Sequence, residues 1–197
     1  GLAGLAAAKT LTEGGAEVVV FERRSSVGGR IASERIGNYL FDTGAKSFAP
    51  RGLSIQHYML ESLDRTELVE VTKPIYSHTS LHVFAGSMAH ARVPRFTYLS
   101  GNDCFARLLA NGLDVRLGAN VEGIERQNDG YLVMNEHFDA VVIASSLPQA
   151  EPLLWSLGET RPLANSSYRS CISMMLGFAS ELPEQKYHAI VDPEQMH

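Results

Sequence analysis

The sequence predicts an α/β fold, in which helices cover a parallel sheet, joined to a partial antiparallel α+β domain. An Ala-rich segment with helical spacing (2–13) is followed directly by a β-branched run (16–21), and a second continuous apolar run occupies 138–144. Helices that alternate with such runs are typical of parallel sheets buried on both faces. Between these runs, 67–95 consists of short alternating segments separated by Gly and Pro, which indicates antiparallel strands.

The composition limits the classes of function. Hydrophobic residues make up 45% of the 197 residues and charged residues 20%, which excludes a disordered polymer. Lys and Arg number 17 against 22 Asp and Glu, a net charge of -5, so we expect no nucleic-acid partner. No apolar stretch approaches the ~20 residues that span a bilayer. We therefore expect a soluble, cytoplasmic protein with no membrane partner and an oligomeric state that the sequence leaves open.

Metal and disulfide chemistry have little support in the sequence. Cys104 and Cys171 lack the CxxC spacing of a thiolate metal site, and no disulfide framework is predicted. His78 and His82 fall on a strand-like segment with no third ligand nearby, so we predict no metal site. The chain begins with Gly1 rather than Met, inside what resembles a turn, and we interpret it as a fragment of a longer protein.

The first part of the chain carries clear stop and turn residues between its elements. Gly14-Gly15 ends the helix predicted over 2–13, before the strand over 16–21. Gly37-Asn38 separates two β-prone segments, 31–36 and 39–41, and predicts a hairpin because both residues tolerate positive φ. Asp42 and Glu34 are interpreted as solvated residues of this hairpin rather than as an acid–base pair.

The remaining elements follow from the same two periodicities. Helices are predicted over 53–63, 101–110 and 147–157, and strands over 68–71, 75–78, 81–84, 115–117, 121–125, 131–134, 138–144 and 170–178. Asn128-Asp129-Gly130 is a turn signal between two of these strands.

The first four residues carry a nucleotide-binding signal. Gly1-Leu2-Ala3-Gly4 matches the last four residues of G-x-G-x-x-G, in which the backbone approaches a pyrophosphate at a helix N-terminus. The following strand ends at Glu22, 21 residues after Gly1, where an acidic side chain would hold the ribose hydroxyls of an adenine dinucleotide. The alternative is an ordinary helix start with a surface Glu.

Gly28-Gly29-Arg30 adds a second candidate phosphate contact. Two successive glycines allow a backbone approach that a Cβ would block, and Arg30 can donate charge-assisted hydrogen bonds to the same diphosphate. The alternative interpretation of these three residues is a solvated surface turn.

These segments resemble a known family. The G-G-R-x-x-S stretch within 25–33 and the F-D-x-G-A-x-x-F stretch at 41–48 resemble the flavin-containing amine oxidase superfamily, and within it the renalase-type FAD-dependent oxidoreductases. Ser26, where monoamine oxidases usually have Arg, favours the renalase-type branch. The resemblance implies a Rossmann-type FAD-binding domain (GR2-like) with FAD as cofactor. It extends the cofactor-binding set to Arg23, Gly44, Ala45, Lys46, Val121, Ala144 and Ser145.

The resemblance also implies roles for some of these residues. Val121 would contact the adenine through its backbone, and Ala144 and Ser145 would pass near the diphosphate. Lys46 would either stabilise negative charge at the N1 side of the flavin or be a solvated surface Lys. No catalytic residue is assigned.

The implied domain division interleaves two domains. We expect 1–50 and 101–160 to form the FAD-binding domain, 51–100 to be a substrate-domain insertion, and 161–197 to begin the substrate-domain sheet. The implied reaction is hydride transfer from an amine or a reduced nicotinamide-like substrate to flavin N5, with reoxidation by oxygen or another acceptor, although we expect the fragment alone to be inactive. The alternatives are an NAD(P)-dependent dehydrogenase and a non-catalytic dinucleotide-binding module.

Overall fold

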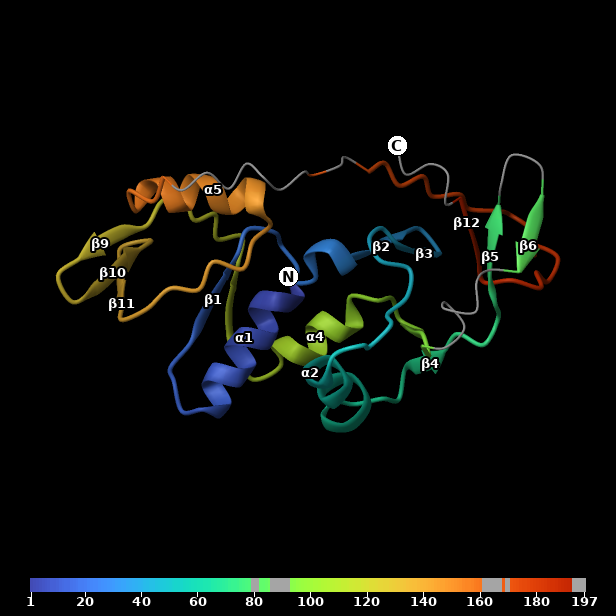
Figure 1. Ribbon diagram of the computed structural model, residues 1–197, viewed down its shortest axis with the longest axis horizontal. Helices are drawn as coiled ribbons and strands as arrows, with labels where there is room; N and C mark the ends of the chain where they lie inside the picture. Colours follow the sequence, from blue (N-terminus) through green and yellow to red (C-terminus); the bar gives the residue numbers. More distant parts are fainter. Residues whose placement is uncertain (79–81, 86–92, 161–167, 169–170, 193–197) are drawn as a thin grey trace. The chain divides into compact units, whose positions relative to one another are not determined.

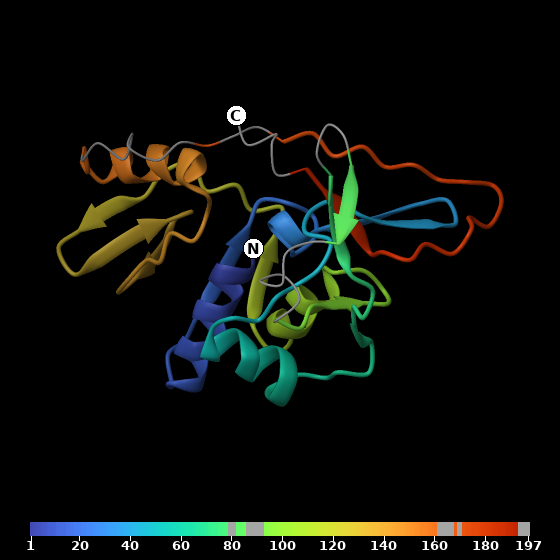
Figure 2. The same cartoon turned by 45° about the vertical axis from the view of Figure 1, so that its right-hand side comes forward.

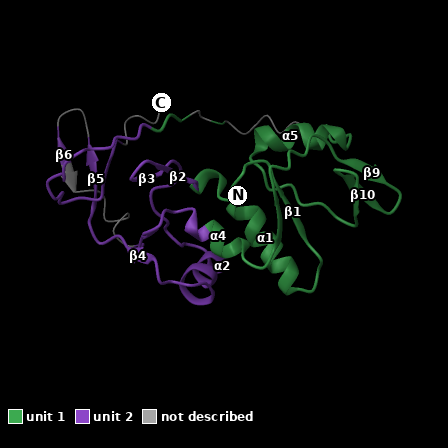
Figure 3. Cartoon of the chain, turned by 180° about the vertical axis from the view of Figure 1, so that it is seen from behind, with its two compact units in different colours: residues 1–31, 106–173 green, residues 32–105, 174–197 purple. Residues whose placement is uncertain are grey.

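The computed structural model describes residues 1–78, 82–85, 93–160, 168 and 171–192. The chain divides into two compact units, each assembled from two stretches of sequence (Figure 3). Unit 1 comprises 1–31 and 106–173, and unit 2 comprises 32–105 and 174–197. The four-segment domain division expected from the sequence stays a prediction.

Unit 1 is built on a parallel pair of strands. Helix α1 (Leu2–Glu13) precedes β1 (Val19–Glu22), which pairs in parallel with β8 (Asp114–Leu117), and α1 lies alongside β1 (Figures 1 and 2). Leu5 and Ala8 are the buried residues of α1. The predicted helix and strand are confirmed, but β1 is half-buried along its length rather than buried on both faces.

The second part of unit 1 is a small antiparallel sheet with a helix. Strands β9 (Glu125–Gln127), β10 (Gly130–Val133) and β11 (Glu136–Phe138) pair in the order β11-β10-β9, and α5 (Leu147–Ser156) follows. The tight turn between β10 and β11 is formed by Met134 and Asn135, whose φ angles are 50° and 64°.

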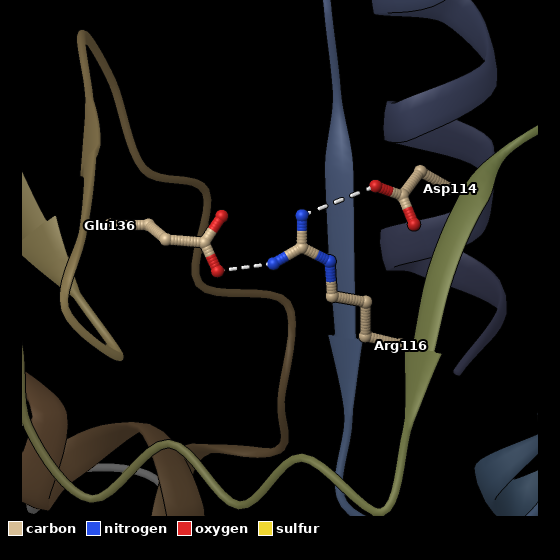
Figure 4. Close-up of polar contacts among 3 residues, drawn as sticks. All are labelled: Asp114, Arg116 and Glu136. Atoms are coloured by element: carbon tan, nitrogen blue, oxygen red, sulfur yellow. Dashed lines mark hydrogen bonds and ion pairs between the residues drawn. The ribbon is translucent and has the colours of Figure 1, made fainter.

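An ion-pair cluster connects β8 with β11. The Arg116 guanidinium on β8 donates to the Glu136 carboxylate on β11, and its other terminal nitrogen lies 3.4 Å from Asp114 Oδ2 (Figure 4). The same guanidinium lies 5.5 Å from the centroid of the Phe21 ring, which packs edge-on against Phe138. Hydrogen bonding to Glu136 raises the pKa of Arg116.

One predicted strand of unit 1 is wrong, and another lies at different residues. Over 138–144 only the first residue lies in a strand, the segment 140–144 is irregular, and Val142 is 62% exposed. A β-prone run forms a strand only where a neighbour supplies hydrogen-bond partners, and none of the described residues pairs with it. The strand predicted over 121–125 is also shifted, because pairing that starts at the turn at Gly130 extends back only to Glu125.

Unit 2 contains a hairpin and a helical segment with an unusual second half. The predicted hairpin is confirmed as β2 (Ser33–Ile36) and β3 (Tyr39–Asp42). Helix α2 (Leu53–Gln56) continues as a π-helical segment, η2 (His57–Ser62), so the predicted helix exists but changes its hydrogen bonding midway. Tyr58 and Met59 of η2 are buried.

The strands of unit 2 form two further sheets. Strand β4 (Leu68–Glu70) pairs antiparallel with β7 (Phe96–Tyr98), next to which Phe48 forms a bridge to Phe96. Strand β5 (Ile75–His78) pairs antiparallel with β6 (Val83–Ala85) and in parallel with β12 (Ala189–Val191), so this sheet is mixed rather than antiparallel.

The last predicted elements are confirmed only in part. The predicted helix over 101–110 is α4 (Cys104–Ala110), which begins three residues later. Leu81 and Ser170, the first residues of two predicted strands, lie outside the described residues. The described residues 171–178 form no strand, and Ile172 is 95% exposed, because nothing in the described chain pairs with them. Neither Cys104 nor Cys171 forms a disulfide within the described residues.

Within the described residues, no helix has the length and apolar character needed to cross a bilayer.

Candidate functional site

The N-terminus of α1 offers backbone donors. Gly1 is the N-cap and provides no side-chain cap, and the first turn contains no acidic residue. The first intrahelical bond runs from Leu5 N to Gly1 O over 3.2 Å, so helix geometry leaves the N–H groups of Leu2, Ala3 and Gly4 without a helical acceptor. Because the helix dipole adds positive potential at this end, the turn favours an anion.

The Gly28-Gly29 turn approaches this helix start closely. Gly28 and Gly29 have φ angles of 129° and 59°, and a short 3₁₀ helix, η1 (Gly29–Ile31), follows. A Cβ on Gly29 would lie 3.3 Å from Gly1 Cα, and one on Gly1 would lie 4.0 Å from Gly28 O. The two glycine-containing segments therefore come together backbone to backbone.

Glu22 ends β1 next to the same turn. Its Oε1 accepts a hydrogen bond from Arg24 N (3.0 Å), its Oε2 lies 3.5 Å from Gly1 N, and its side chain is 16% exposed. The backbone of Glu22 also accepts from Ala119 N (3.0 Å), which ties the loop leading to Val121 to the end of β1.

The segment after β11 contacts the first turn of α1. A Cβ on Gly4 would lie 3.2 Å from the Ala144 Cβ, so the irregular segment that contains Ala144 and the exposed Ser145 packs against the helix start. The predicted site residues that unit 1 gathers around the start of α1 are Gly1, Ala3, Gly4, Glu22, Gly28, Gly29, Ala144 and Ser145.

Other predicted site residues form no hydrogen bond or ion pair with the start of α1 in the described structure. Arg23 and Arg30 are exposed, and neither guanidinium forms a hydrogen bond or an ion pair within the described chain. Val121 is half-buried in an irregular segment. Among the described residues, no cluster of three or more His, Cys, Asp or Glu is arranged to hold a metal ion.

Gly44, Ala45 and Lys46 belong to unit 2, in the loop after β3. Gly44 N donates to Ala32 O (3.4 Å), the exposed Lys46 donates through its ammonium to the Asp42 backbone carbonyl, and Ala45 O accepts from Asn102 Nδ2 (2.9 Å). This loop is therefore held from both sides by its own unit.

Sequence reasoning missed the polar network beneath this loop. Asn102 is completely buried. The Asp42 carboxylate accepts hydrogen bonds from the backbone N–H of Asn102 (2.8 Å), from the side-chain amide of Asn102 (3.1 Å) and from Ser33 Oγ (2.6 Å). The interpretation of Asp42 as a solvated hairpin residue is therefore wrong. The two residues are 60 positions apart, and the only local signal was the turn-like Gly101-Asn102-Asp103 before a helix.

The contacts of unit 1 have the chemistry of a dinucleotide site. Free N–H groups at a helix start, a glycine turn without side-chain bulk and a carboxylate next to both can bind a diphosphate and the hydroxyls of a ribose. The space between Gly29 and Gly1, which a Cβ on Gly29 would fill, is consistent with a diphosphate that approaches the backbone here.

A comparison with known families identifies the cofactor class. Two overlapping ranges, 2–96 and 76–195, match the sequence model described as flavin containing amine oxidoreductase. Together these ranges cover most of the chain. Proteins of this family carry a flavin, consistent with FAD here, and the family implies a Rossmann-like FAD-binding fold, flavin-dependent oxidoreductase activity and a small-molecule substrate. The chain belongs to the flavin containing amine oxidoreductase family.

Proposed function

We propose that the chain binds the ADP half of FAD on unit 1 and serves a renalase-like oxidoreductase that oxidises an amine or a reduced nicotinamide-like compound. The observation that carries the proposal is the contact between the Gly28-Gly29 turn and the start of α1, with the Glu22 carboxylate beside it. Ser26, where monoamine oxidases usually have Arg, supports the renalase-type branch.

The diphosphate would lie at the start of α1. The N–H groups of Ala3 and Gly4 have no helical acceptor, and the glycine turn lets the phosphate oxygens approach the backbone. Arg30 and Arg23 are exposed cations on the same unit, and Arg30 follows the glycine turn directly. Their unengaged guanidinium groups can donate to phosphate oxygens when the cofactor binds.

The ribose would be held by Glu22. A carboxylate has about four acceptor positions, and the contacts with Arg24 N and Gly1 N leave capacity for two hydroxyl donors. Val121 follows the loop tied to the Glu22 backbone, which supports its assignment to the adenine side, and Ala144 and Ser145 border the diphosphate.

Bound FAD would supply the chemistry of the proposed reaction, hydride transfer from the substrate to flavin N5 with reoxidation by oxygen or another acceptor. The resemblance alone assigns Gly44, Ala45 and Lys46 to the cofactor-binding set, since in the described structure this loop of unit 2 contacts only its own unit. In this proposal Lys46 supplies a positive charge near the flavin, and its hydrogen bond to the Asp42 carbonyl orients the ammonium.

The proposal is tested by titrating the apoprotein with FAD. Glu22→Ala should weaken FAD binding tenfold or more, since a hydrogen bond to a charged group contributes roughly 1.5–3 kcal/mol before water replaces it. Glu17→Ala, an exposed acid that precedes the same strand, is the charge-matched control and should bind FAD like the wild type. Equal affinity for the wild type and Glu22→Ala, or tighter binding of NAD⁺ than of FAD by the wild type, would overturn the assignment.

A further inference from the structure

Arg95 is a half-buried cation of unit 2 whose backbone is held at the start of β7. Its carbonyl accepts a hydrogen bond from Val71 N (2.8 Å), which extends the antiparallel pairing of β4 with β7 by one residue. The next residue, Phe96, exchanges two backbone hydrogen bonds with Phe48, over 2.8 and 2.9 Å. The main chain at Arg95 is therefore fixed by neighbours on both sides.

The guanidinium of Arg95 lacks a counter-charge in the described structure. Its Nε is buried and has no hydrogen-bond partner there, and its Nη1 lies 3.4 Å from Ser47 Oγ. No carboxylate of the described chain forms an ion pair with this guanidinium. Because a partly desolvated charge without a partner costs free energy, the end of this side chain favours an anion.

The strand register explains why Arg95 has no partner on β4. Glu70 lies opposite Phe96 in the pair of strands. Side chains alternate between the two faces of a sheet, so Glu70 projects from the face opposite to that of Arg95. The segment of the sequence that precedes Arg95, 86–92, contains no Asp or Glu. The charge of Arg95 is therefore not compensated by its neighbours in the sheet.

Ser47 supplies a second donor beside the guanidinium. Ser47 and Arg95 directly precede Phe48 and Phe96, the two residues that the backbone bridge joins, so this pairing places their side chains on the same face. Ser47 Oγ accepts from Arg95 Nη1, which leaves the hydroxyl hydrogen free to donate. The hydroxyl has no further partner among the described residues. The guanidinium and the hydroxyl can therefore donate to one anion.

We propose that Arg95 and Ser47 form a binding site for a small oxyanion, the carboxylate or phosphate group of a ligand. The site lies within unit 2 and does not depend on the proposed function. The oxyanion accepts from the terminal nitrogens of the guanidinium and from the Ser47 hydroxyl, and it supplies the missing negative charge. Since the planar guanidinium matches carboxylate and phosphate oxygens, the site prefers these ions to chloride.

The test is a titration of the full chain, followed by two-dimensional amide NMR. Sodium phosphate, sodium acetate and sodium chloride are added separately at constant ionic strength. The amide signals of 47–48 and 95–97 report the Arg95–Ser47 site. The amide signals of 2–4 report the start of α1, where phosphate can also bind under the proposed function. The two sites are therefore followed separately in one experiment.

Four variants identify the donors. Arg95→Gln removes the charge and should raise the dissociation constant of the preferred anion about tenfold or more. Arg95→Lys keeps the charge without the planar donors, so its dissociation constant should lie between those of the wild type and Arg95→Gln. Ser47→Ala should raise the constant roughly threefold. Arg35→Gln, an exposed position of β2, makes the same change of charge in unit 2 and should bind the anion like the wild type.

Thermal unfolding without added anion separates binding from folding. Because the Arg95 cation has no counter-charge in the described chain, Arg95→Gln should melt no lower than the wild type. A clearly lower melting temperature would show that the guanidinium has a structural partner, which contradicts the inference.

The three anions decide between the possible results. Phosphate and acetate should both displace the signals of 47–48 and 95–97 and chloride should not. Tighter binding of acetate indicates a carboxylate-bearing ligand, and tighter binding of phosphate a phosphate-bearing one. Displacement that is equal for chloride, or that persists in Arg95→Gln, would overturn the inference. Phosphate that displaces only the signals of 2–4 would overturn it as well and leave the proposed function intact.

Discussion

Gly29 and Gly1 are in backbone contact, with the position of a Cβ on Gly29 only 3.3 Å from Gly1 Cα. The two residues lie in different turns, one before α1 and one after β1, and neither turn has side-chain atoms between it and the other. Any side chain at position 29 must either separate the turns or occupy the space next to the first N–H groups of α1. The contact therefore links the local conformation of one turn to the accessibility of the candidate phosphate site.

Gly29→Ala should lower both stability and FAD affinity. The residue has a φ of 59°, where an added Cβ costs roughly 1 kcal/mol by itself, and the contact with Gly1 adds a second cost. Gly37→Ala is the matched control, because Gly37 has a φ of 58° and a Cβ there meets nothing within 4 Å. Thermal unfolding and FAD titration of both variants separate strain from close approach. Equal losses in the two variants would show that the contact contributes nothing.

Gly4→Ala should have an effect whose sign depends on residue 144. Alanine is favoured over glycine inside a helix by about 1 kcal/mol, but at position 4 its Cβ would lie 3.2 Å from the Ala144 Cβ. We expect Gly4→Ala to be neutral or destabilising in the wild type and stabilising by up to about 1 kcal/mol in an Ala144→Gly background. Denaturant unfolding of the four proteins of this cycle measures the coupling. Additive effects would contradict the packing of the 144 segment on α1.

The elements that could be predicted from the sequence have local signals at their ends. Gly14-Gly15 marks the end of α1, and Gly37-Asn38 marks the turn of the hairpin, so the sequence predicts both elements with nearly correct bounds. The segment 140–144 has the composition of a buried strand, but composition says nothing of the neighbour that a strand needs, and in the described structure the segment pairs with none.

The residues of the candidate site also fall into those that the sequence predicts and those that only the structure reveals. The helix start, the glycine turn and Glu22 could be found because dinucleotide binding requires fixed residue types at fixed spacing. The contact between Asp42 and Asn102 spans 60 residues and belongs to no spacing rule, so only the structure reveals it. The packing of Ala144 against Gly4 is likewise a tertiary contact, although the family resemblance by itself implies a role for residue 144.

Tyr98→Phe should not destabilise the protein, and it should become advantageous at high pH. The Tyr98 hydroxyl is buried and has no hydrogen-bond partner in the described chain, so its removal should change the unfolding free energy by between zero and about 1 kcal/mol in the stabilising direction. Burial raises the pKa of Tyr98 above its ordinary value of 10.0. As the pH rises, Tyr98 therefore ionises first in the unfolded chain, which favours unfolding. The contribution of Tyr98 to the free energy of unfolding is unchanged below pH 10.0 and decreases above it.

Tyr39→Phe is the matched control for this prediction. The Tyr39 hydroxyl donates to the Phe178 carbonyl (2.8 Å), so its removal should cost about 0.5–1.5 kcal/mol. Urea unfolding at neutral pH and at several values above pH 10.0 measures both variants. A Tyr98→Phe protein that is clearly less stable than the wild type at neutral pH would mean that the hydroxyl has a partner.

The last prediction concerns Arg30, which is exposed and has no side-chain partner in the described chain. If its guanidinium engages the diphosphate, Arg30→Lys should be costly even though the charge is kept, because an ammonium cannot reproduce the planar arrangement of donors. The loss of a bidentate pair to a partly buried phosphate should weaken FAD binding by about 1.5–3 kcal/mol, whereas substitution of a surface Arg stays within about 0.5 kcal/mol. Arg35→Lys, at an exposed hairpin position, controls for the change of side chain itself. The test measures FAD dissociation constants at one ionic strength for the wild type, Arg30→Lys, Arg30→Ala and Arg35→Lys. We expect Arg30→Ala to bind FAD most weakly and Arg30→Lys to bind it next most weakly. The wild type and Arg35→Lys should bind FAD equally. If all four bind FAD equally, the segment at Gly28-Gly29-Arg30 is a surface turn, and the phosphate must be held by the start of α1 alone.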